Sequence, residues 1–119
     1  MAFRFEELEI WKASNNYIKD IYLITKKFPK EEAFALISQL KRAAGSVSAN
    51  IAEGSGSSSK KDFSHYLDIS IKSIFETVSH LYLAKEQKYI TERDRICLYE
   101  QAEILVKRIN SFKKWLNKK

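Results

Sequence analysis

The sequence predicts an all-α protein, an up-down-up-down antiparallel four-helix bundle that assembles as a homo-oligomer. Apolar residues recur at alternating spacings of three and four through four long segments, which is the period of a helix. The chain holds only three glycines and one proline, too few for the many turns of a β-sandwich. Its 119 residues are the size of one domain, so we interpret residues 1–119 as a single unit. Long helical segments joined by short loops favour a bundle.

The first two helices are predicted over residues 6–27 and 30–53. Pro29 separates them, because the residue before a proline is pushed out of the α region. An apolar seam that begins at Ala33 runs along the second helix with helical spacing. Gly54 then stands where glycine commonly ends a helix, just after the C-cap.

The third and fourth helices are predicted over residues 60–87 and 92–117. Each is preceded by a hydroxyl residue with an aspartate three positions later, at Ser59 and at Thr91, which is the pattern of a capping box. Between the two helices, the chain is expected to turn near Lys88. All four helices are long enough to lie side by side along most of their length.

The second helix contains a stretch, residues 43–52, with no charge and little bulk. On a helical wheel Ser38, Gly45, Ala49 and Ala52 fall together on one side, and a mid-helix glycine costs about 1 kcal/mol relative to alanine. We therefore interpret this helix as covered twice, by its own bundle and by a neighbouring subunit. The alternative is an Ala/Ser-rich helix that is simply exposed.

The net charge of +6 permits an acidic partner such as RNA or DNA, but a solvated lysine-rich surface accounts for it equally well. The candidate nucleic-acid-binding residues are Lys26, Lys27, Lys41, Arg42, Lys60, Lys61, Lys107, Arg108, Lys113 and Lys114. No base-reading module is visible in the sequence. Binding is therefore expected to follow the phosphate backbone and to depend strongly on salt.

Other chemistry finds little support in the sequence. Glu76 and His80 are four apart on one helix, a common chance spacing, so no metal site is predicted. The stretch "EGSGSSSK" lacks the spacing of a phosphate-binding loop, and Ser59 is better explained as a helix cap than as a nucleophile. No catalytic residue and no cofactor are therefore predicted, and we interpret the chain as non-enzymatic.

The expected location is the cytoplasm. Cys97 is the only cysteine, so no internal disulfide can form, and we interpret it as a small buried or half-buried apolar residue. The N-terminus lacks the apolar run of a signal peptide, and no segment is apolar for long enough to span a membrane.

Three stretches carry a family resemblance: "FEELEIWKAS", "QLKRAAGSVSANIAEGSG" and "DFSHYLDISIKSIFET". They resemble the bacterial four-helix-bundle family of 23S rRNA intervening-sequence proteins, over about residues 5–116. The resemblance implies a homopentamer, in a family of which some members are encoded inside insertions in large-subunit rRNA genes. The family is also similar to the accessory variability determinant of diversity-generating retroelements, a basic pentamer that binds nucleic acid and a reverse transcriptase.

The resemblance also marks signature positions without assigning them a catalytic role. Together with two small residues of the predicted subunit contact, they are Gln39, Arg42, Gly45, Ser46, Ala49, Asn50, Glu53, Gly54, Ser73 and Glu76. Two functions are expected to compete. The first is a nucleic-acid-associated accessory protein that works as an oligomeric ring, with RNA or DNA and a reverse transcriptase or other protein as partners. The alternative is a protein-interaction scaffold with no nucleic-acid role.

Overall fold

The computed structural model describes residues 2–118, which form four α-helices and, within that range, no β-strand. The helices are α1 (Glu9–Thr25), α2 (Leu36–Ser55), α3 (Lys60–Glu86) and α4 (Glu92–Lys118). Two short 3-10 helices, η1 (Arg4–Glu7) and η2 (Lys30–Glu32), precede α1 and α2. The prediction of an all-α fold is confirmed for the described residues.

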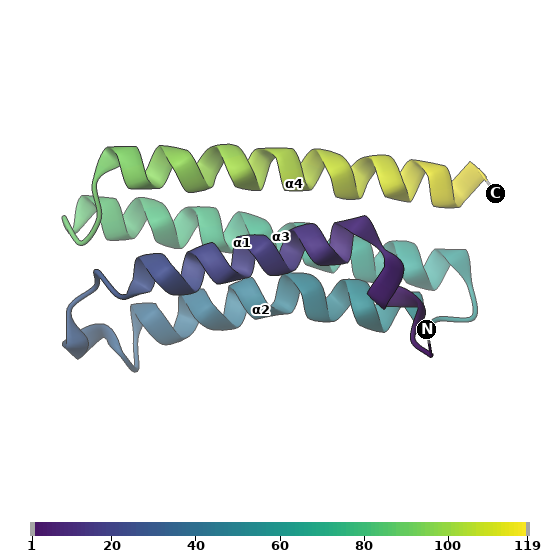
Figure 1. The fold of residues 1–119 in the computed structure, drawn as a ribbon, viewed down its shortest axis with the longest axis horizontal. Coiled ribbons are helices and arrows are strands. Elements are labelled where there is room, and N and C mark those ends of the chain that lie inside the picture. Colours follow the sequence, from purple (N-terminus) through teal and green to yellow (C-terminus); the bar gives the residue numbers. More distant parts are fainter. Residues whose placement is uncertain (1, 119) are drawn as a thin grey trace.

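The four helices lie side by side in an elongated body of 46 × 23 × 21 Å, and successive helices run in opposite directions (Figure 1). Each helix packs against two neighbours, whereas α2 and α4 stand diagonally opposite and their Cα atoms stay more than 8 Å apart within the described residues. The short helix η1, the end of α4 and the α2–α3 loop gather at one end of the body, on the right of Figure 1. The C-terminal half of α4 therefore lies beside the start of α3.

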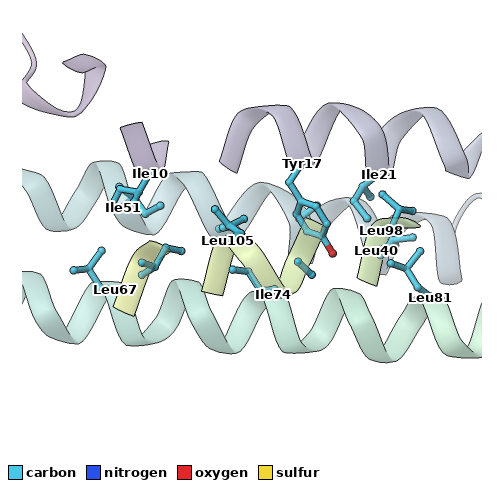
Figure 2. Close-up of a cluster of buried hydrophobic side chains, with 14 of the residues drawn as sticks. Ile10, Tyr17, Ile21, Leu40, Ile51, Leu67, Ile74, Leu81, Leu98 and Leu105 are labelled. Atoms are coloured by element: carbon cyan, nitrogen blue, oxygen red, sulfur yellow. The ribbon is translucent and has the colours of Figure 1, made fainter. Parts of the chain in front are cut away.

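The core runs the length of the body and draws on all four helices (Figure 2). Its side chains come from the predicted three-and-four positions, and Leu40, Ile74 and Ile109 are among those closed to solvent. One polar pair lies inside this core, where the hydroxyls of Tyr17 and Thr77 are 2.8 Å apart. Burial raises the pKa of Tyr17 to about 12, and the hydrogen bond with Thr77 offsets only part of that shift.

The first helix is shorter than predicted. It begins at Glu9 and not at residue 6, because Leu8 is extended (φ −78°, ψ 124°), and it ends at Thr25 and not at residue 27. The preceding residues form η1, which is fixed by aromatic contacts: the ring centroids of Phe5 and Trp11 are 4.9 Å apart. Trp11 thus holds the N-terminal turn against α1 and interrupts what the sequence pattern suggested was one continuous helix.

The second helix begins six residues later than predicted, at Leu36 and not at residue 30. The carboxylate of Glu32 accepts hydrogen bonds from the Leu36 backbone N–H at 3.3 Å and from the Tyr89 hydroxyl at 2.7 Å, which folds the connecting chain over the end of the bundle. Ala33 is consequently exposed and outside the apolar seam, contrary to the prediction. Phe34 beside it is fully exposed (100%).

Gly54 does not end α2 as predicted, since the helix continues through it to Ser55. The residue is buried against α3. A Cβ at this position would lie 2.7 Å from Cδ1 of Phe63 and 2.8 Å from Cβ of Tyr66. Glycine is therefore needed for close approach of two helices, not to terminate one.

The starts of α3 and α4 follow the predicted caps. The Ser59 side chain accepts from the backbone N–H of Asp62 at 3.1 Å. At α4 both reciprocal bonds are present, from the Thr91 N–H to Asp94 Oδ2 at 3.1 Å and from the Asp94 N–H to Thr91 Oγ at 3.0 Å. In the turn between the helices, Lys88 has a positive φ of 65°.

Candidate nucleic-acid interface and oligomer surface

Most of the polar signature residues meet in two hydrogen-bonded clusters, about one turn apart, between α2 and α3. We call the two clusters together the α2–α3 seam, and its members are Arg42, Ser46, Asn50, Ser73, Glu76 and His80. Arg42 Nη2 donates to Glu76 Oε2 at 2.7 Å, and His80 Nε2 lies 3.1 Å from the same oxygen. One turn further along, Ser73 Oγ donates to Ser46 Oγ at 3.0 Å.

Two further bonds extend the seam. Asn50 Nδ2 donates to both the carbonyl and the hydroxyl of Ser46, each at 2.8 Å. Beneath the seam, the buried hydroxyl of Ser70 donates to the Val47 carbonyl at 2.8 Å. The α2–α3 contact is thus tied by hydrogen bonds at several successive turns, which fixes the two helices in register.

Glu76 is the hub of the seam because it faces two cationic or potentially cationic groups. Partial burial alone would raise the pKa of Glu76, but the hydrogen bonds from His80 and Arg42, with their charges, outweigh it. They hold the pKa of Glu76 below its usual range. The carboxylate therefore stays ionised at neutral pH and accepts hydrogen bonds from α2 and α3 at once.

The seam separates the signature residues into two groups. The pairs Arg42–Glu76 and Ser46–Ser73 hold α2 to α3, and Asn50 bonds Ser46 within α2. Sequence reasoning missed that His80 belongs with them. The spacing of Glu76 and His80 was visible, but the arginine that joins them comes from another helix. Gln39 and Glu53 are exposed and outside the seam.

The outer face of α2 is open to solvent in the single chain. Ser38 and Ala49 are exposed, and Gly45 and Ala52 are half-buried. A Cβ at Gly45 would have no atom within 4 Å, so the bundle's own packing gives no reason for glycine there. The predicted inner cover of α2 is present, and the predicted outer cover would have to come from another molecule.

The ten candidate basic residues fall into two groups. Four are engaged within the chain: Lys27 pairs with Asp94 at 3.1 Å, Lys41 lies 4.8 Å from the Tyr22 ring centroid, Arg42 joins the seam, and Lys113 pairs with Asp68. The other six carry no ion pair with residues 2–118, namely Lys26, Lys60, Lys61, Lys107, Arg108 and Lys114.

The C-terminal half of α4 concentrates the positive charge. Residues 104–119 hold six of the chain's 21 Lys and Arg residues and none of its 15 Asp and Glu residues, so their charge equals the net +6 of the whole chain. Lys107, Arg108 and Lys114 are exposed on this helix, and Trp115 beside them is 52% exposed. Sequence reasoning placed lysines and arginines here but did not notice that the acids stop at Glu103.

Two kinds of feature are absent from residues 2–118: a group of metal ligands and a helix that could span a membrane. Within 2–118, no three His, Cys, Asp or Glu side chains are grouped closely enough to hold a metal ion. Among the helices of that range, none has a stretch both long and apolar enough to cross a bilayer. Cys97 is exposed, which corrects the interpretation of a buried or half-buried thiol.

Fold and site together define a small, basic, all-α protein whose signature residues join two helices of a bundle. The chain belongs to the family described as 23S rRNA-intervening sequence protein, whose model matches residues 6–111. The resemblance seen in the sequence is therefore confirmed. No curated protein is significantly similar to the chain.

A solved structure agrees with this family. It is the crystal structure of a protein of unknown function from the S23 ribosomal protein family of Bacteroides thetaiotaomicron. It superposes with a TM-score of 0.77 at 25% sequence identity, covering 88% of this chain and 98% of that one. The likeness supports the four-helix arrangement along most of the chain.

Proposed function

We propose that the chain is a non-enzymatic accessory protein of the cytoplasm that binds RNA or DNA through the phosphate backbone, as a homo-oligomeric ring. The observation that carries the proposal is the acid-free C-terminal segment, residues 104–119, whose six Lys and Arg residues equal the net charge of the whole protein. A homopentamer is the assembly that the family resemblance implies.

The chemistry of this face suits a nucleic-acid backbone better than a folded protein partner. Lys107, Arg108 and Lys114 make no ion pair within residues 2–118, so no internal contact is lost when they meet phosphates. Trp115 offers an aromatic surface on which a base can stack. In a ring the face is repeated around the circumference, which multiplies a weak attraction per subunit.

A fluorescence titration with structured RNA and with DNA at several salt concentrations tests the proposal. The wild type should bind both at low salt, with a steep loss of affinity as salt rises. The triple variant Lys107→Gln, Arg108→Gln, Lys114→Gln should reduce the slope of log K against log salt by about three. The matched control removes three exposed lysines at the opposite end of the bundle, none of them a candidate binding residue: Lys19→Gln, Lys30→Gln, Lys88→Gln. Absence of binding at low salt, or equal loss in the two triple variants, would contradict the assignment.

A second function is favoured by a separate observation. Phe75, Tyr82 and Tyr99 are exposed along the α3–α4 side, which suits a protein-interaction scaffold better than a nucleic-acid-binding protein. For a scaffold, the positive charge serves solubility, and a protein such as the reverse transcriptase implied by the resemblance is a possible partner class. The same titration separates the two, since a scaffold binds neither nucleic acid at low salt.

A further inference from the structure

An apolar groove lies between α3 and α4 on the outside of the bundle. We call it the α3–α4 groove. It has a volume of about 300 Å³, its floor and walls include Phe75, Val78, Tyr99 and Val106, and Glu103 and Lys107 lie at its rim. Phe75 is 64% exposed although it lies mid-helix on a long, ordered element. These aromatic side chains contribute little to the core and leave apolar surface in water.

The groove and the outer face of α2 present opposite kinds of side chain to solvent. Exposed aromatic side chains project from one, and the other presents Gly45, Ala49 and Ala52 with almost no side chain to project. Because a Cβ at Gly45 would meet open space, glycine there has no role in the fold that would offset its cost to the helix. A partner whose side chains need close access to the α2 backbone supplies that role.

The two surfaces also lie at the same height along the bundle. Bonds of Arg42 to Glu76 and of Ser46 to Ser73 place Gly45 level with α3 residues beside Phe75. The α3–α4 contacts, from Lys113 to Asp68 and from Arg95 to the Tyr82 ring, place Glu103 close to the same level. Two copies standing side by side can therefore bring α2 to the groove without sliding along the axis.

The charges match in the same arrangement. The helices α2 and α4 run in the same direction (Figure 1). Along α2, Arg42 precedes the small residues and Glu53 follows them; along α4, Glu103 precedes the basic half that begins at Lys107. A neighbour with parallel axes sets Arg42 towards Glu103, and Glu53 level with Lys113 on the α3 side of α4. A neighbour turned end for end sets like charges together.

We propose that the α3–α4 groove of one copy receives the outer face of α2 from a second copy, with the two bundle axes parallel. The proposal rests on the homo-oligomer of the proposed function and names its contact surfaces. Because α2 and α4 are diagonal in the bundle, the two surfaces lie on different sides of one copy. The contact is therefore heterologous, with different surfaces of the two copies meeting, and it gives the ring of the proposed function where the rotation from copy to copy closes a circle.

A mixing experiment tests this pairing in full-length protein. Gly45→Gln puts a long side chain on the α2 face but leaves the groove intact, and Phe75→Gln removes the exposed ring from the groove but leaves α2 intact. Each variant alone should associate at least about tenfold more weakly than the wild type, measured by sedimentation velocity. Circular dichroism should find both folded, since both positions face solvent. The matched control is Leu23→Gln, another exposed apolar residue, on α1 away from both surfaces.

Mixed in equal amounts at high concentration, the two variants should form a 1:1 dimer of twice the 13.9 kDa chain mass, because one native contact remains between them. Normal assembly of either variant alone would overturn the proposal. So would a mixture that stays monomeric while the wild type assembles, and in that case the ring of the proposed function still stands. A wild-type protein that is monomeric at the same concentration would contradict both the proposed contact and the proposed ring.

Discussion

The two sides of α3 differ in how completely they are packed. Towards α2, the helix is tied by the α2–α3 seam, by the buried Ser70 bond to the Val47 carbonyl and by close approach at Gly54. Towards α4, large aromatic side chains stand at the surface and a groove of about 300 Å³ remains. One contact is complete within the chain and the other leaves apolar area in water. In our proposal, a second copy of the chain covers this apolar area.

The largest loss of stability is expected at Gly54, where α2 and α3 approach closely. Gly54→Ala should lower the free energy of unfolding by about 3 kcal/mol, because the new methyl overlaps Phe63 and the Cβ of Tyr66 and forces the helices apart. Urea denaturation followed by circular dichroism measures the change. Gly45→Ala, with open space at the same atom, is the control and should leave the isolated chain as stable or more stable. Equal effects at the two glycines would contradict the packing account.

Tyr17 tests the polar pair that joins α1 to α3. Its pKa is raised to about 12 in the folded chain, above an ordinary value of about 10 in the unfolded chain. The resulting stability is present below pH 10 and is lost as the pH rises from about 10 to 12, by about 2 to 3 kcal/mol in total. Tyr17→Phe should abolish this part of the alkaline loss in denaturation series. An unchanged alkaline profile in the variant would show that Tyr17 is not the titrating group.

Glu76→Gln tests the hub of the seam. The pKa of Glu76 is held below its usual value, so its contribution is present above the ordinary carboxylate pKa and is lost as the pH falls through the lowered one. Since the side chain is partly exposed, the expected cost at neutral pH is below about 1 kcal/mol. Denaturation at neutral and acidic pH should find the variant weaker only at neutral pH. A deficit that persists in acid would point to lost packing and not to the ion pairs.

The smallest effect on the free energy of unfolding is expected on the side of α3 that faces α4. Phe75→Gln should change the free energy of unfolding of the dissociated chain by no more than about 0.5 kcal/mol, because the ring is mostly in water already. Denaturation at low protein concentration measures it. A loss of several kcal/mol would mean that the groove's aromatic residues belong to the core, and the contrast between the two sides of α3 would disappear.

Much of the helical pattern could be predicted from the sequence. The spacing of core residues such as Leu40 and Ile74, and the caps at Ser59 and Thr91, follow from local rules, and the structure has them. The predicted helix starts are wrong where contacts between residues distant in the sequence set the helix boundary. Trp11 folds the N-terminal turn back against α1, and Tyr89 holds Glu32 from across the bundle, so the starts of α1 and α2 fall later than the period implies.

The site was predictable only in part, for the same reason. Signature residues such as Arg42 and Glu76 could be marked one by one, but their partnership with His80 spans two helices and has no local signal. Gly54 was interpreted by the local rule for helix ends, while its neighbour Phe63 sets its actual role. The groove is likewise formed by two helices together. The sequence shows only aromatic residues next to the apolar helix positions, and whether they are exposed depends on how α3 and α4 pack.

The central claim is that the outer face of α2 and the α3–α4 groove are completed by a second copy of the chain. Sedimentation velocity of the wild-type protein at micromolar concentration tests it most directly. The account predicts a species several times heavier than the 13.9 kDa chain. A single boundary at the mass of one chain would contradict it.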